Sequence, residues 1–177
     1  MKAFRNDSKG QSGKHVPEFQ ALVPVDVSRP SFRGLASASR RATIAARGAS
    51  RKTNSRCEIT LRQELSRLRL RYRLHHPRLP GRPDIVFSKE KVLIFCDGDF
   101  WHGRNLQTRL VKLSAGHNAP YWVSKIRRNV ERDREVNAYL RTAGWRVIRV
   151  WETDILSGPT EVASRIAAIV RRRRRTI

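Results

Sequence analysis

Helical and strand periods of apolar residues alternate through the middle of the chain. A helix is predicted from Glu58 onward, because leucines recur at steps of four and three residues on one face. These leucines are Leu61, Leu65 and Leu68. Two short apolar runs at 84–87 and 92–95, separated by a polar turn, predict two adjoining strands that are both buried.

The second half of this region predicts a long helix, a strand and a last helix. The long helix spans 121–142 and ends at Gly144, the strand spans 145–151, and the last helix covers 159–170. The order helix, strand, strand, helix, strand, helix is typical of an α/β fold with a mixed β-sheet flanked by helices.

The inward face of the predicted long helix contains an acid. Steps of three and four residues place on this face Ile126, Val130, Asp133, Asn137 and Leu140. An ionised carboxylate beside apolar neighbours is costly unless another group pairs with it. Asp133 is therefore expected to have a partner.

Both ends of the chain are basic. Residues 1–56 contain 12 Lys and Arg against 3 acids, interspersed with Ser, Gly and Ala. This composition predicts a mostly disordered basic N-terminal arm, with a short helix near 40–47; an inert extension is the alternative. Residues 171–177 are expected to form a basic C-terminal tail, which leaves 57–170 as the globular domain.

The whole chain carries 38 Lys and Arg against 15 Asp and Glu, a formal net charge of +23. Such an excess favours a polyanion, above all nucleic acid, as the partner. An anionic membrane surface, an acidic protein and a merely solvated basic surface are the alternatives. No apolar run approaches the roughly 20 residues of a membrane span, so no membrane partner is expected.

The two cysteines, Cys57 and Cys96, have neither the paired spacing of a zinc ribbon nor the density of a disulfide scaffold. A reducing compartment fits this usage. The chain start has no apolar stretch like that of a secretory signal, although its Arg-rich and Ser-rich composition also fits an organelle transit peptide. The cytoplasm is the expected location.

Two acids lie at the ends of the predicted strands. Asp84 follows Pro83, and Asp97 comes 13 residues later, at the end of the next apolar run. Adjacent strand ends can converge, and two carboxylates with a backbone carbonyl make an oxygen site suited to Mg²⁺. Acids at strand ends are also common turn formers, which is the alternative.

Residues 95–104 add two adjacent aromatics and a histidine after the second strand. His102 could relay protons, although a histidine that is simply hydrogen-bonded is the commoner case. In an extended chain Phe100 and Trp101 would point to opposite faces, which predicts that at least one is exposed. An exposed aromatic in a basic protein indicates base stacking or a wedge, while core packing is the usual role.

Four blocks of the sequence resemble successive blocks of the very short patch repair (Vsr) nucleases, in the same order and spacing. They are residues 79–87, 94–102, 121–133 and 144–152. The resemblance extends to Vsr-like homing endonucleases and implies a restriction-endonuclease-like fold for 57–170. The arm before Cys57 has no counterpart in it.

The resemblance implies a set of catalytic residues, namely Glu58, Asp84, Asp97, His102 and Asp133. Asp84 and the backbone carbonyl of Cys96 would hold Mg²⁺, with Glu58 acting through water and Asp97 as a further candidate ligand. His102 would transfer protons and be oriented by Asp133, which would supply the expected partner.

The resemblance also implies DNA-binding residues, which are Phe100, Trp101, Arg104, Trp122, Lys125 and Arg128. Aromatic side chains inserted beside the cut would offset part of the cost of distorting DNA. For Trp122, anchoring its helix in the core is the alternative.

The sequence departs from the family at two places. Repair members hold a structural zinc with Cys and His, where this chain has Asp99, Arg104 and Thr153, so no structural zinc is expected. Asp97 stands where the best-known members have a second histidine, which makes the site more acidic.

The function predicted is Mg²⁺-dependent hydrolysis of a DNA phosphodiester bond, as a strand nick at a mismatch in double-stranded DNA, by a monomer bound to the nucleoid. A homing or restriction-like endonuclease that cuts an intact site is the alternative. A nucleic-acid-binding protein without catalysis is the alternative of another class.

Overall fold

The computed structural model describes residues 34–35, 37, 40 and 53–176. The expected N-terminal arm, with its short helix near 40–47, lies almost entirely outside these residues. The elements are α2 (Arg56–Arg67), β1 (Arg73–Leu74), β2 (Ile85–Phe87), β3 (Val92–Asp97), α3 (Leu106–Ser114), α4 (Ala119–Thr142), β4 (Arg146–Trp151), α5 (Glu152–Ser157) and α6 (Pro159–Arg174).

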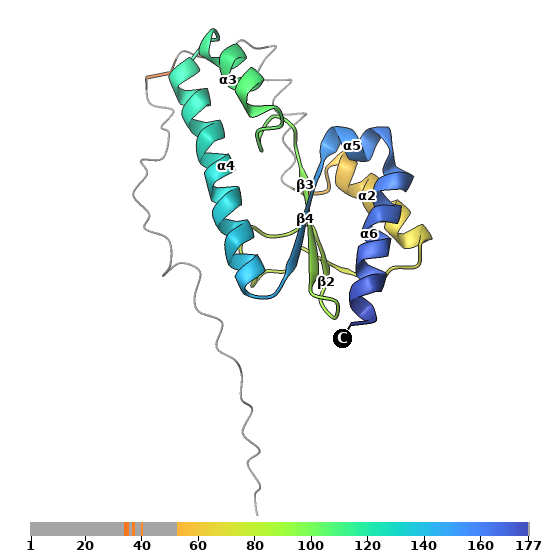
Figure 1. Cartoon of the computed structure of the whole chain (residues 1–177). Coiled ribbons are helices and arrows are strands. Elements are labelled where there is room, and N and C mark those ends of the chain that lie inside the picture. Colours follow the sequence, from red (N-terminus) through yellow and green to blue (C-terminus); the bar gives the residue numbers. More distant parts are fainter. Residues whose placement is uncertain (1–33, 36, 38–39, 41–52, 177) are drawn as a thin grey trace, which may run out of the picture.

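The four strands form one mixed sheet in the order β1-β2-β3-β4. Strand β3 pairs antiparallel with β2 and parallel with β4. Figure 1 shows α4 and α3 on one side of this sheet and α2, α5 and α6 on the other. The predicted α/β fold with a mixed sheet flanked by helices is confirmed.

Each face of the sheet has its own hydrophobic core, because side chains alternate across a strand. Toward α2, α5 and α6, the strands contribute Ile85, Phe87, Val92 and Ile94 to a cluster with Leu61, Leu65, Ile155, Ile166 and Val170. Toward α4, they contribute Val86, Leu93, Phe95 and Val147 to a cluster with Val136 and Leu140. Both predicted strands 84–87 and 92–95 are buried, as expected.

Three elements were not predicted, and two helices are longer than predicted. Strand β1 and helix α5 are too short to give a periodic pattern, and α3 follows the aromatic block directly. Helix α4 begins two residues early, with a proline in its first turn, where proline is well tolerated. Helix α6 continues to Arg174, because arginines are good helix formers and favourable at a helix C-terminus.

The strand register determines where the predicted acids meet. Asp84 immediately precedes β2, whose Ile85 pairs with Ile94, so Asp84 lies beside the carboxyl end of β3. Asp97, the last residue of β3, pairs with Trp151 at the carboxyl end of β4. Functional groups from β2, β3 and β4 therefore converge at one end of the sheet. No helix among the described residues has the length and apolar character needed to cross a membrane.

Candidate active site

Asp84 is attached to the end of β3 by a backbone hydrogen bond. The amide of Cys96 donates to its Oδ2 at 2.7 Å. Burial raises the pKa of Asp84 from its usual 3.8 to about 6, and the negative charges of Glu58 and Asp97 add to the rise against the opposing Cys96 hydrogen bond. Asp84 is thus a carboxylate whose charge is poorly compensated by the protein.

The carbonyl of Cys96 belongs to the same corner of the sheet. The N–H and C=O of a strand residue point to the same side, so this carbonyl faces the side on which Asp84 lies. Pro83, the residue that would continue β2, has no N–H to donate to β3. An oxygen pair from Asp84 and Cys96 can therefore face a common ligand.

Glu58 lies in the first turn of α2 and is 5% exposed. Its carboxylate accepts the amide of Asn54 at 3.0 Å and the Ser55 hydroxyl at 2.8 Å, and the Ser55 side chain accepts the Glu58 amide. This is a capping box, which the Ser-x-x-Glu spacing at 55–58 could have predicted. Glu58 consequently stabilises its own helix while lying close enough to raise the pKa of Asp84.

His102 and Asp133 form the pair that the sequence predicted. His102 Nδ1 lies 2.6 Å from Asp133 Oδ2. Although burial acts to raise it, the pKa of Asp133 is lowered by the hydrogen bond from His102 and by the charge of Arg149. Because an ionised carboxylate can only accept, Nδ1 carries the proton, and Nε2 is the nitrogen available to a substrate.

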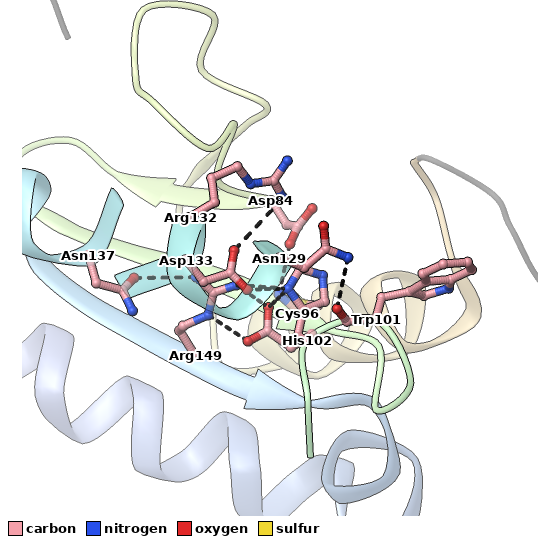
Figure 2. Close-up of polar contacts among 10 residues, drawn as sticks. Asp84, Cys96, Trp101, His102, Asn129, Arg132, Asp133, Asn137 and Arg149 are labelled. Atoms are coloured by element: carbon pink, nitrogen blue, oxygen red, sulfur yellow. Dashed lines mark hydrogen bonds and ion pairs between the residues drawn. The ribbon is translucent and has the colours of Figure 1, made fainter. Parts of the chain in front are cut away.

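The loop that carries His102 is packed closely against α4. Gly103 has φ +76°, and a Cβ there would lie 2.6 Å from Val130 Cγ2, so another residue would be both strained and obstructed. The side-chain amide of Asn129 (Nδ2) donates to the backbone carbonyl of Trp101 at 3.0 Å (Figure 2). Asn129 was not predicted as a site residue; nothing in the sequence pattern marks it.

Asp97 is 3% exposed and pairs with a residue that the sequence analysis missed. Arg149 of β4 binds both of its carboxylate oxygens, at 2.6 and 2.7 Å. Asp97 Oδ1 also lies 3.7 Å from His102 Nδ1. A charged residue within the predicted strand 145–151, opposite the inward-facing Asp133, was the signal that could have revealed Arg149.

The predicted aromatic residues form one cluster with a lysine. The ring centroids of Phe100, Trp101 and Trp122 lie 4.9 to 6.1 Å apart. Lys125 Nζ lies 5.5 Å from the Trp101 and Trp122 rings. The expectation that Phe100 and Trp101 point to opposite faces is wrong, because residues 99–105 form turns rather than an extended strand.

Of the other expected DNA-binding residues, Arg128 lies on α4, whereas Arg104 pairs with acids of the loop and of α5. Arg104 NH2 pairs with Asp154 at 2.7 Å, and its guanidinium lies 3.6 Å from Asp99. Asp99 in turn accepts the Thr153 hydroxyl. The three places where zinc ligands were missing are thus linked by an ion pair and a hydrogen bond that join the loop to α5.

The described part of the chain contains no group of three or more His, Cys, Asp or Glu side chains that could hold a metal ion. A site that uses Asp84 with the Cys96 carbonyl would need only one such side chain as a direct ligand. The absence of a structural zinc stays a prediction.

Comparison with known proteins identifies the family. The profile described as DNA mismatch endonuclease Vsr matches residues 35–108. A type II nicking enzyme, V.NmeDIP of Neisseria meningitidis serogroup C, is 38% identical over 114 residues, which are 64% of this chain and 76% of the relative. Another, V.HpaIIP of Haemophilus parainfluenzae, is 37% identical over 120 residues, 68% of this chain and 84% of the relative. The chain belongs to the Vsr family of DNA endonucleases.

A further Vsr-family relative is the DNA mismatch endonuclease Vsr of Escherichia coli K12, which is 42% identical over 83 residues, or 47% of this chain and 51% of the relative. The Vsr resemblance and the prediction of a DNA endonuclease are confirmed. The structure brings all five predicted catalytic residues of this Vsr-family chain to one end of the sheet.

Proposed function

We propose that this Vsr-family endonuclease nicks one strand of double-stranded DNA at a mismatched base pair and acts as a monomer. The names of its relatives, nicking enzymes and a mismatch endonuclease, support this substrate. Among the described residues, the His102 and Asp133 pair adjoins Asp97, whose charge also acts on Asp84, and one such set suffices to cut one phosphodiester bond. This juxtaposition is the observation that carries the proposal.

The proposal includes Mg²⁺ held by Asp84 and the Cys96 carbonyl, with Glu58 acting through water. The raised pKa of Asp84 fits this role, since a buried carboxylate beside two other acids gains most from a divalent cation. A bound Mg²⁺ would polarise the scissile phosphate and lower the pKa of attacking water. Asp97 fits a metal less well, because Arg149 binds both of its oxygens.

His102 is the proton-transfer group of the proposed reaction. Its Nε2 would exchange a proton with the attacking water or the leaving 3′ oxygen, leaving a 5′-phosphate and a 3′-hydroxyl. Asp133 holds the ring from the Nδ1 side, so the opposite nitrogen faces the DNA. This arrangement is the usual one for a histidine that works as acid and base.

The aromatic cluster would support the distorted duplex. Phe100, Trp101 and Trp122 lie next to the loop of His102, and rings that stack against a base offset part of the unstacking cost. A mismatched pair is already weakly stacked, so it requires less energy to open. The cluster therefore favours a mismatch over an intact site.

Cleavage of end-labelled duplexes, one with a T:G mismatch and one fully matched, tests the proposal. Wild type and Asp84→Ala are compared in Mg²⁺ and in EDTA, with Glu135→Gln, an exposed acid of α4, as the control. A nick in one strand of the mismatched duplex that requires Mg²⁺ and Asp84 is expected. Equal or faster cutting of one matched duplex would favour the homing or restriction-like activity instead.

A further inference from the structure

Arg149 is the cation at the centre of the polar network beside His102. It comes from β4, its side chain is 18% exposed, and its guanidinium lies 4.7 Å from the centre of the Phe95 ring. Figure 2 shows its side chain beside Asp133 of α4 and His102 of the loop, and it also binds Asp97 of β3. One residue thus contacts the three segments that build the proton-transfer half of the site.

The contacts of Arg149 use nearly all of its hydrogen-bonding capacity. A guanidinium has five N–H groups in a fixed fork. Two bind Asp97, another faces Asp133 Oδ2 at 3.1 Å, and a fourth donates to Asn137 at 3.3 Å. An arginine engaged in this way is not available to bind a phosphate, so its role is exerted through its neighbours.

The most consequential neighbour is Asp133. Its Oδ2 atom receives His102 Nδ1 at 2.6 Å and the Arg149 guanidinium at 3.1 Å. The same Arg149 NH2 group lies 3.2 Å from His102 Nδ1, so the arginine contacts both members of the His102 and Asp133 pair. A fixed carboxylate in turn selects the His102 tautomer with the proton on Nδ1.

Arg149 also offsets the cost of burying two carboxylates, those of Asp97 and Asp133, close to His102. Asp97 and Asp133 would repel each other at this separation, and burying both without a cation would cost several kcal/mol. Arg149 bridges them, and although burial acts to lower it, its pKa is raised by the hydrogen bond and charge of Asp97 and by Asp133. The arginine is therefore charged and lies between the two acids.

We propose that Arg149 is a positioning residue for the nicking reaction: by binding Asp97 and Asp133 together, it holds His102 in one tautomer and one orientation, with Nε2 toward the scissile phosphate. The inference rests on the proposed function, in which His102 transfers the proton. It assigns Asp97 to the same positioning unit, as the anchor of Arg149 rather than a metal ligand.

The test uses the full chain and variants that separate charge from geometry. Arg149→Met is combined with Asp97→Asn, so that the cation is removed together with its main counter-ion, Asp97. Asp97→Asn alone keeps Arg149 on Asp133, and Arg149→Lys keeps the charge without the fork. Arg146→Met, an exposed arginine of the same strand, is the matched control. Far-ultraviolet circular dichroism and urea denaturation establish that each variant folds.

The first readout is the imidazole ¹⁵N spectrum of His102 at about pH 8.5, where an ordinary histidine is neutral. A His102→Gln variant assigns its signals. Wild type and Arg146→Met are expected to show the Nδ1–H tautomer alone, Asp97→Asn a smaller departure from it, and the double variant a mixture. A folded double variant that keeps the Nδ1–H tautomer alone would overturn the proposal.

The second readout separates the cleavage step from DNA binding. In single-turnover cleavage of the mismatched duplex, the double variant is expected to lose roughly 10²–10⁴-fold in rate, the usual contribution of acid and base catalysis, with DNA affinity little changed. The cleavage rate of Arg149→Lys is expected to lie between those of wild type and the double variant. A full wild-type rate in Arg149→Lys would contradict a role for the fixed fork of guanidinium N–H groups. If wild type cuts no duplex at all, the proposed function fails, while the ¹⁵N spectra still decide the role of Arg149.

Discussion

The two halves of the active site differ in how the charge of their carboxylates is balanced. Asp97 and Asp133 share Arg149, and the pKa of Asp133 is lowered despite its burial. Asp84 is half-buried with Glu58 and Asp97 as acidic neighbours, and its pKa is raised to about 6. The charges of Asp97 and Asp133 are thus balanced within the protein, whereas the charge of Asp84 is left poorly compensated.

The half with paired carboxylates is organised before substrate binds, whereas the Asp84 half is suited to binding a cation. A carboxylate that is paired within the fold adds to stability and keeps its position whether or not substrate is present. A carboxylate left poorly compensated costs stability, and that cost is recovered when a cation binds. Removing a charge should consequently have opposite effects on folding in the two halves, which makes the comparison testable.

The largest effect is expected on catalysis at Asp84. Asp84→Asn keeps the shape and an acceptor for the Cys96 amide but removes the negative charge. Cleavage of a mismatched duplex in Mg²⁺ should fall by roughly 10³-fold or more, since a metal-bound phosphate is stabilised by several kcal/mol. Single-turnover assays measure this loss. Activity within tenfold of wild type would mean that the metal is held elsewhere.

The paired half should lose stability when its charge is removed. Asp97→Ala leaves the Arg149 guanidinium, whose side chain is 18% exposed, without its main counter-ion. The free energy of unfolding should fall by about 3 kcal/mol, the usual cost of breaking a buried ion pair from one side. Urea denaturation measures it, with the exposed Glu131→Ala as control. A change below about 0.5 kcal/mol would contradict the buried pair.

The other half should gain stability from the same kind of change. The folded pKa of Asp84 is above the usual 3.8, so the ionised carboxylate weakens the fold as pH rises from about 4 to about 6, and fully above that. Without added metal, Asp84→Asn should be more stable than wild type by about 1–3 kcal/mol at pH 8. Near pH 4 the advantage should disappear. An Asp84→Asn variant that is less stable than wild type at pH 8 would contradict the proposed difference between the two halves.

The smallest expected effect is the pH dependence of cleavage at low Mg²⁺. The proposed metal site would require ionised Asp84, whose pKa of about 6 means that half of it is protonated at about pH 6 and most of it below. Cleavage should then fall about tenfold for each pH unit. Because Mg²⁺ competes with protons, higher Mg²⁺ should move the profile to lower pH. A profile that does not respond to Mg²⁺ concentration would assign the titration to another group.

Much of this arrangement could be predicted from the sequence, and the missing parts have a common reason. The long helix, the buried strands and the inward-facing Asp133 follow from periodicity, and the resemblance to Vsr nucleases added His102 and Glu58. Arg149 and Asn129 were missed because each acts through a partner distant in sequence, and periodicity reports only which face a residue occupies. Likewise, only the register of β2 against β3 explains why Asp84 meets the amide of Cys96.

The Asp97 and Arg149 pair also bears on the order in which the protein acquires its activity. The two residues are 52 positions apart, and they meet only when β4 pairs with β3. Contacts between distant residues form late, because a long loop must close first. A chain emerging from the ribosome therefore carries most of its Lys and Arg before β4 is made, and the proton-transfer half of the site can assemble only after β4 has paired with β3.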